Sequence, residues 1–452
     1  MKTSTRNRKL HDWKDETTVV PFSGIQFLDF GFNANDCPYK TMSFIERTTE
    51  RSAEGDARTL LVLTGDDDLD AAILSDAQPD DEEYQINQAK ALEPFVEKWT
   101  PVPMLRVRHG SGHDSQDRHD PGPTCWARIF IKELDEPDPK TGHTHWVILA
   151  LDTTCETVED MRFYQAPSLE DGERKFEFVA DSDKVGWFVS WVEADDSGNT
   201  HDLQAWVDEW LLDQFEAVQK KPKRPRSDDE MPERLFEHWS RFFAFLKLLD
   251  GAIRFPTIRL VDTMSRDPIS DRFRYTPIDV DLVLDVGNSN TCGILIESSP
   301  DGGSVNLTDC YTLSLRDLSD PVNRYTGTFE SRIEFSDARF GDGRAARSRS
   351  FFWPSLVRVG PEAMRLTRDD LGTETVSGLS SPKRYLWDDR PMIQDWRFHN
   401  FTPSLAEPLP LVARATCSSV PSICPLTSCS PSLTAMPRSP SISSNSSRAT
   451  CR

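Results

Sequence analysis

Hydrophobic residues recur at helical spacing in two segments of the chain. In 202–219 and 233–249 the apolar positions are mostly three or four residues apart, as on one face of an α-helix. They are Leu203, Trp206, Trp210, Leu211, Phe215 and Val218 in the first segment, and Leu235, Trp239, Phe242, Leu246 and Leu249 in the second. The pattern predicts two helices that pack through these aromatic stripes, the second ended by Gly251.

Two other segments predict β-hairpins. Residues 125–154 hold two runs rich in Val, Ile, Phe and Trp around a Pro/Asp/Gly turn. Residues 280–297, VDLVLDVGNSNTCGILIE, hold two apolar runs around a polar loop at 287–290. The first of these runs is nearly continuous, which predicts a strand covered on both faces. The turn PDGG, 300–303, leads into a third predicted strand at 307–318.

Composition limits the class of protein. The 452 residues are long enough for two or three domains, and 37% of them are hydrophobic. A formal net charge of −22 argues against nucleic acid and anionic membranes as partners. No apolar run approaches the about 18 residues that a membrane span needs. The basic N-terminus is not followed by the apolar stretch of a signal peptide, so we expect a cytoplasmic protein.

The cysteines and histidines form no recognisable metal motif. Of nine cysteines, five are scattered without a C-x-x-C pair, which predicts reduced, half-buried residues: Cys37, Cys125, Cys155, Cys292 and Cys310. His143 and His145 are two apart, which would place both on one face of a strand. His109, His113 and His119 lie in a stretch of loop composition. Exposed histidines are favoured over a metal cluster.

Changes in composition suggest where the chain divides. The stretch 220–226, KKPKRPR, is interpreted as a stiff linker, and its alternative is a basic address signal. We therefore predict an N-terminal α+β domain at 18–221, followed by a helix and linker at 222–275. A third region is predicted at 276–400 and a Ser/Pro/Cys-rich tail at 401–452.

The tail differs in composition from the rest of the chain. Ser, Pro, Thr and Cys dominate it, and no acidic residue follows Glu407. A disordered Ser/Pro tail is one interpretation. A shifted reading frame is favoured, because natural linkers rarely concentrate cysteine together with serine and proline. Another frame of the gene is then expected to continue an acidic, amphipathic sequence.

The polar loop between the two apolar runs is equipped to bind a phosphate. Gly287 can adopt backbone angles that other residues cannot, and successive backbone N–H groups at such a tip bind anions. Asn288 and Asn290 belong to the same tip, and Ser289, Asn290 and Thr291 add neutral hydrogen-bond donors. Asp285 precedes the loop and is predicted to hold Mg²⁺ through water.

These residues resemble a known phosphate loop. DVGNSNT, 285–291, is similar to the first phosphate loop of the actin, Hsp70 and sugar-kinase superfamily and to that of type III pantothenate kinases. The segment 353–366 resembles the P-S-x-V strand and the V-G-x-x-A segment of Hsp70 proteins. The segment 381–389 resembles their K-R-x-x-G segment, whose lysine acts at the γ-phosphate. Lys383 matches that lysine as the candidate catalytic residue, whereas Trp387 replaces the glycine.

The chain as a whole resembles the SrfB family of bacterial virulence-associated proteins. Phrases such as WARIFIKELDEPD, FWPSLVRVG and SSPKRYLWDD carry this resemblance over about residues 18–400. Family members are longer, and the resemblance is expected to end between Trp396 and Cys417. It implies a family-specific α+β domain at 18–221 and, at 276–400, a partial ATPase lobe, the first half of an α/β actin/Hsp70-like, ribonuclease H-like lobe. A disordered tail in a truncated or frameshifted chain would follow.

The function implied by this resemblance is that of an ATP- and Mg-binding switch with unidentified protein partners. No second loop of the type D-x-G-G-G-T follows residue 300, so the chain as given is expected not to hydrolyse ATP. A non-catalytic scaffold or interaction protein that keeps the fold without using ATP is the alternative. A pantothenate-kinase-like enzyme fits less well, because some 280 residues precede the loop.

Overall fold

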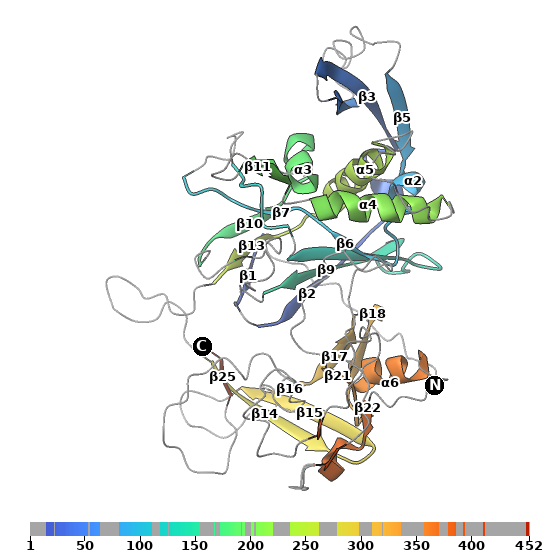
Figure 1. Cartoon of the computed structure of the whole chain (residues 1–452). Coiled ribbons are helices and arrows are strands. Elements are labelled where there is room, and N and C mark those ends of the chain that lie inside the picture. Colours follow the sequence, from blue (N-terminus) through green and yellow to red (C-terminus); the bar gives the residue numbers. More distant parts are fainter. Residues whose placement is uncertain are drawn as a thin grey trace. The chain divides into compact units, whose positions relative to one another are not determined.

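The computed structural model divides into two compact units (Figure 1). The first unit is formed mainly by residues 25–261 with the segment before Val19, and the second mainly by residues after Asp262. The structure describes residues 15–21, 23–52, 55–63, 81–110, 118–124, 126–153, 167, 172–190, 192–194, 200–202, 205–219, 236–261, 278–297, 310–318, 320–335, 357–369, 378–385, 392–393, 410–411 and 449–451.

The first unit combines short helices with several small sheets. Its strands are β1 (Glu16–Val19), β2 (Ile25–Phe32), β3 (Thr41–Ser52), β4 (Gly55–Leu63), β5 (Glu82–Asn87), β6 (Trp99–Pro101), β7 (Met104–Arg106), β8 (Ala127–Glu133), β9 (His145–Asp152), β10 (Lys175–Phe178), β11 (Val192–Ala194), β12 (Thr200–Asp202) and β13 (Thr257–Leu260). Its helices are η1 (Ala34–Asp36), α2 (Gln88–Leu92), α3 (Ser182–Val189), α4 (Ala205–Val218) and α5 (Glu237–Ala252).

Two four-stranded sheets organise this unit. One has the strand order β2-β9-β8-β6 and the other β1-β13-β10-β7. The predicted hairpin at 125–154 is confirmed, because β8 and β9 pair antiparallel over Ala127–Glu133 and His145–Asp152. Every residue of β9 is buried, as expected for a strand covered on both faces. A further sheet has the order β4-β3-β5 and contacts α5 (Figure 1).

The two helices predicted from the apolar spacing are confirmed as α4 and α5, which pack against each other (Figure 1). The predicted stop at Gly251 is wrong by one residue, because α5 continues to Ala252. Phe95, which follows α2, packs against both helices: its ring centroid lies 4.5 Å from that of Phe245 and 6.2 Å from that of Trp210. The aromatic stripes are therefore core.

The prediction that the histidines are exposed is wrong at two positions. His119 and His145 are buried rather than exposed, and His143 precedes β9 instead of sharing a strand face with His145. His145 stacks on Phe32 at a centroid distance of 4.8 Å, and burial lowers its pKa. Sequence spacing did not reveal these contacts because they come from other strands. Among the described residues no group of three potential ligands could hold a metal ion.

An ionic cluster joins the segment 118–119 to β10 of the second sheet and leads to a first prediction. Glu177 on β10 accepts hydrogen bonds from His119 Nε2 at 3.2 Å and Arg118 Nη2 at 2.6 Å. The bond to His119, followed by those to Arg118, lowers the pKa of Glu177 to about 2. We expect Glu177→Gln to reduce the free energy of unfolding by about 2 kcal/mol at neutral pH.

The pH dependence gives this prediction its test. A depressed pKa stabilises the fold above the unfolded value of 4.5 and loses that effect as the pH falls towards about 2. Urea titrations of wild type and Glu177→Gln should therefore converge on acidification. Glu136→Gln, which removes an exposed carboxylate, is the matched control and should show little change at any pH. A pH-independent difference for Glu177→Gln would contradict the argument.

The second unit is also rich in strands. Its strands are β14 (Ile278–Val286), β15 (Asn290–Glu297), β16 (Cys310–Thr312), β17 (Ser314–Asp317), β18 (Asp320–Thr326), β19 (Phe329–Glu330), β20 (Arg332–Phe335), β21 (Val357–Val359), β22 (Gly378–Ser380), β23 (Met392–Ile393), β24 (Pro410–Leu411) and β25 (Ala449–Cys451). Its helices are α6 (Gly360–Asp369) and η4 (Pro382–Tyr385). The main sheet has the order β16-β15-β14-β25, and β19 also pairs with β15.

The predicted hairpin at 280–297 is confirmed, with β14 and β15 antiparallel. The third predicted strand, 307–318, is instead divided: β16 pairs with β15, whereas β17 pairs with β18. The expectation that the first strand is covered on both faces is also wrong. Val283 and Leu284 belong to opposite faces, yet their exposures are 48% and 47%. The described helix α6 packs mainly on β17, β19, β20 and β21.

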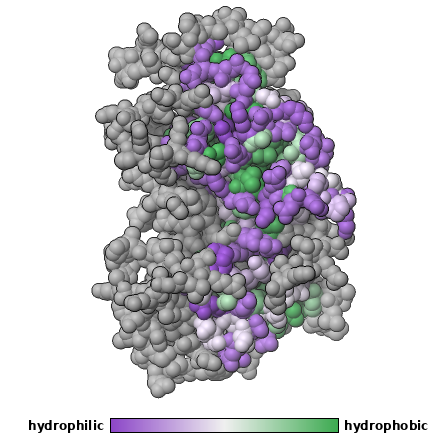
Figure 2. Space-filling view, turned by 90° about the vertical axis from the view of Figure 1, so that its right-hand side faces the viewer, coloured by the Kyte–Doolittle hydropathy of each residue, from purple (hydrophilic) through white to green (hydrophobic). Residues whose placement is uncertain are grey.

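The surface of the described residues is largely polar. Figure 2 shows one face of the molecule on which hydrophilic residues predominate and hydrophobic residues gather in small patches. This agrees with the mean hydropathy of −0.53 and the large negative net charge. Cys37 is buried and Cys292 and Cys310 are half-buried, and all three are free thiols.

The predicted boundaries compare with the two units as follows. The first unit ends at Val261, within the stretch 222–275 that was predicted as helix and linker, and α5 and β13 of that stretch pack inside the first unit. Of the predicted tail at 401–452, the structure describes only β24 and β25. The remainder of the tail and the predicted linker 220–226 lie outside the described residues.

Candidate functional site

The candidate phosphate loop is the tight turn between β14 and β15. Val286 pairs with Thr291, and the N–H of Gly287 donates to the Asn290 carbonyl at 2.9 Å. A Cβ atom on Gly287 would lie 2.5 Å from that carbonyl oxygen, closer than such contacts allow. Glycine is therefore required at this position by the close approach of the two ends of the turn.

The turn leaves the main-chain N–H groups of two residues, and the side chains of three, available to bind an anion. The N–H of Gly287, which the sequence counted among the phosphate donors, is used inside the turn. Asn288 and Ser289 are exposed, and their N–H groups bond to no other described residue. Asn290 is exposed beside them. The donors at the tip are thus the main chain of 288 and 289 and three polar side chains.

A residue that the sequence did not single out connects the site. Ser331 lies between β19 and β20 and is only 6% exposed. Its N–H donates to the Ser289 carbonyl at 2.8 Å, and its hydroxyl shares a 2.7 Å hydrogen bond with the hydroxyl of Thr291. Its carbonyl accepts from the N–H of Ser381 at 3.0 Å. Ser331 therefore joins the loop to the segment that carries Lys383.

The structure brings some of the predicted site residues together and separates others. Lys383 is half-buried in η4, two residues after Ser381, whose φ is +58°. Asp285 is exposed and pairs with Cys292, whereas Thr291 pairs with Val286. Paired residues share a face and neighbours alternate, so Asp285 and Thr291 belong to opposite faces of the hairpin. The Ser331 hydroxyl bonds to Thr291, on the face opposite Asp285.

A polar cluster under α6 was also missed by sequence reasoning. Asp317 accepts from Arg365 Nε at 2.7 Å, and buried Glu334 accepts from Arg332 at 3.2 Å and from the Thr367 hydroxyl at 3.0 Å. The pKa of Glu362 is raised to about 7, chiefly by burial. Arg365 and Thr367 of α6 thereby contact Asp317 of β17 and Glu334 of β20, and β20 directly follows Ser331.

The residues fit a magnesium–nucleotide complex only in part. A phosphate requires donors, which the exposed tip at 288–290 supplies together with the ammonium of Lys383. Magnesium usually keeps several waters and takes one or two carboxylates from protein, so a single exposed Asp285 satisfies the minimum. The donor set is that of an open anion site.

The helices of the described part of the chain are all too short or too polar to cross a bilayer. This agrees with the absence of a long apolar run in the sequence.

Comparison with known proteins places the chain in a family. No curated protein and no solved structure matched it. The family model described as virulence factor SrfB matches residues 7–448. The matched range runs past Trp396 and Cys417, between which the resemblance was expected to end. Because the match covers nearly the whole sequence, the chain belongs to the SrfB virulence factor family.

Proposed function

We propose that this SrfB chain is part of an ATP-binding protein of the actin/Hsp70 type, in which the turn at 287–290 holds the phosphates. The observation that carries the proposal is the position of Ser331, which hydrogen-bonds to Ser289, Thr291 and Ser381. These bonds fix the phosphate loop and the Lys383 segment relative to each other, as a site that contacts one phosphate chain from two sides requires.

Each side chain then has a separate role. The N–H groups of Asn288 and Ser289 bind phosphate oxygens, and Lys383 supplies positive charge from η4. Asp285 holds the water shell of Mg²⁺, which neutralises phosphate charge when it is bound. Asp285 and Thr291 belong to opposite faces of the hairpin, so a metal held by Asp285 would lie on the face opposite Thr291.

Calorimetry with ATP tests this proposal. Lys383→Ala should weaken binding about tenfold with or without Mg²⁺, because it removes a charge-assisted contact. Asp285→Asn should weaken binding only when Mg²⁺ is present, because its carboxylate acts through the metal. Thr291→Val should weaken ATP binding by about 1 kcal/mol, the value of one neutral hydrogen bond.

The matched control is Glu297→Gln, which removes a carboxylate at the opposite end of the same hairpin. It should leave ATP affinity unchanged. Equal affinity of wild type, Lys383→Ala and Asp285→Asn for ATP would contradict the proposed site and favour the alternative function.

That alternative is a scaffold or interaction protein that keeps the fold without using ATP. One observation favours it: Val283, Leu284, Ile294 and Tyr311 are large apolar residues exposed on β14, β15 and β16. Val283 and Ile294 share one face of the sheet, and Leu284 and Tyr311 share the other. Exposed apolar side chains on neighbouring strands are typical of surfaces that bind other proteins. A chain that binds no ATP but loses a protein partner on Tyr311→Ser would belong to this class.

A further inference from the structure

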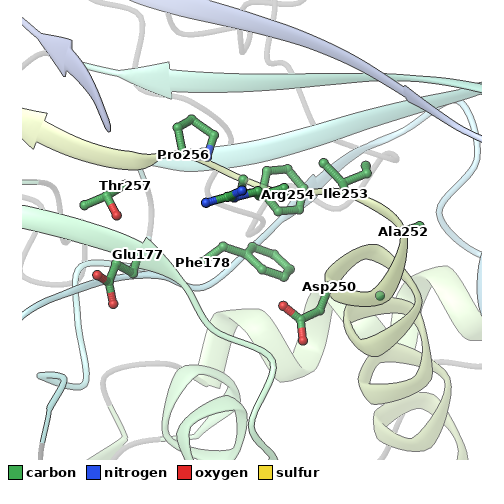
Figure 3. Close-up of a pocket in the computed structure, with 10 residues that line it drawn as sticks. Glu177, Phe178, Asp250, Ala252, Ile253, Arg254, Pro256 and Thr257 are labelled. Carbon is green, nitrogen blue, oxygen red and sulfur yellow. The ribbon is translucent and has the colours of Figure 1, made fainter. Parts of the chain in front are cut away.

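A pocket of about 550 Å³ lies at the C-terminal end of α5 in the first unit (Figure 3). One wall is the last turn of α5 and the segment that follows it, and the opposite wall is β10 with Glu177 and Phe178. Figure 3 shows the carboxylate of Asp250 on one side of Phe178 and that of Glu177 on the other. All of these residues belong to the same unit.

The last turn of α5, which lines this pocket, has unused hydrogen-bond acceptors. The Leu249 carbonyl accepts from the N–H of Ile253 at 2.8 Å. The next three carbonyls, those of residues 250–252, accept no hydrogen bond from the described residues. Pro256, which stands where the Ala252 carbonyl would find its helical partner, has no N–H to donate. The helix therefore ends with a group of bare carbonyl oxygens.

Asp250 adds an uncompensated negative charge to these carbonyls. It is exposed in the last turn of α5 and forms no ion pair with any described residue. A carboxylate is unfavourable there, because the C-terminal end of a helix already carries partial negative charge. The other charges that line the pocket are paired: Glu177 with Arg118 and His119, and Arg254, whose side chain is 85% exposed, with Asp15 at 2.7 Å.

Aromatic rings form the apolar part of the pocket. The ring centroids of Phe178 and Phe255 are 4.5 Å apart, and Phe30 supports Phe255 edge-on at 5.2 Å. The faces of such rings attract cations, most strongly where water is partly excluded. Carbonyl oxygens, a carboxylate and aromatic rings together match one ligand chemistry.

We propose that this pocket binds the ammonium or guanidinium group of an organic cation. Such a group carries several N–H donors for the carbonyls of residues 250–252, a positive charge for Asp250 and a surface that stacks on Phe178 or Phe255. The cation is either a small free amine or the end of a lysine or arginine side chain of a protein partner. A metal ion fits less well, because it keeps its hydration shell and then gains nothing from the phenyl rings.

Titration of the whole chain with agmatine and with a short arginine-containing peptide amide tests this proposal. Both probes should bind, and the same peptide with citrulline in place of arginine should not, because citrulline is nearly isosteric but neutral. Asp250→Asn should weaken binding about tenfold through loss of a charge-assisted contact. Tighter binding of the peptide than of agmatine identifies a protein partner as the source, and equal binding identifies a small amine.

Two further variants separate binding from folding. Asp135→Asn, which removes an exposed carboxylate from the β8–β9 connection, should bind both probes like wild type. Asp250→Lys should abolish binding and yet raise the melting temperature, because a cation is favourable at a helix C-terminus. Equal binding by wild type and Asp250→Asn, equal binding of the citrulline peptide, binding of Ca²⁺ alone or no binding of any probe would each overturn the proposal.

Discussion

Phe242→Ala is expected to reduce the free energy of unfolding of the first unit by about 3–5 kcal/mol. Phe242 is 0% exposed. Its ring lies 5.9 Å from that of Phe95 and 6.3 Å from those of Phe188 and Phe245, measured between centroids. Removing the ring leaves a cavity between three elements that are already packed, so the surroundings recover little of the lost contact.

Urea unfolding followed by tryptophan fluorescence measures this effect, because Trp206 and Trp210 are buried on the neighbouring helix α4. Tyr39→Ala is the matched control, because Tyr39 is an exposed aromatic residue of the same unit. This substitution should lower the free energy of unfolding by about 1 kcal/mol or less. Similar losses for the two variants would show that the aromatic stripe of α5 is not the core of this unit.

The sequence predicted those elements within which the pattern of hydrophobic residues repeats several times. The helices α4 and α5 carry enough apolar residues at helical spacing to define a face, and the hairpins β8–β9 and β14–β15 have strong strand composition around polar turns. By contrast, α6 starts at Gly360 and buries few apolar side chains, among them Ala363 and Leu366. Its polar and apolar residues do recur at helical spacing, but the segment was interpreted by resemblance alone.

The candidate site was predictable only where its residues are neighbours in sequence. The turn at 287–290 is one short phrase, and its glycine follows from local geometry. Ser331, in contrast, is 40 residues from Thr291 and is a small neutral residue between two short strands. The pocket at the end of α5 was equally hidden from sequence reasoning, because Glu177 and Asp250 come to line it only through tertiary packing. Long-range pairing leaves no periodic signal in a single sequence.

Glu362→Gln should stabilise the second unit by about 3 kcal/mol above neutral pH and by much less in mild acid. The Glu362 side chain is 14% exposed, and its Oε1 has no hydrogen-bond partner among the described residues. Arg358 Nε lies 3.5 Å from that oxygen, so its charge only partly offsets the loss of water around the carboxylate. Burial therefore raises the pKa of Glu362 from 4.5 to about 7.

The direction of the pH dependence follows from this shift. Below 4.5 the carboxyl group is protonated in both states, and the folded state incurs no charge-burial cost. Between 4.5 and about 7 only the unfolded state releases the proton, so the wild type loses stability as the pH rises. Glutamine resembles the protonated acid at every pH, so the variant lacks this loss. Its advantage should grow over that interval and then level off.

Thermal melts of both proteins across this pH range measure the difference, and Glu330→Gln is the matched control because Glu330 is an exposed carboxylate on β19 in the same unit. The control should follow the wild-type profile. The size of the effect depends on Arg358, which is buried and loses a charged neighbour in the variant. If the ion pair outweighs burial, Glu362→Gln becomes less stable than wild type above neutral pH. That sign would refute the raised pKa and assign Glu362 and Arg358 to a stabilising pair that holds α6 to β21.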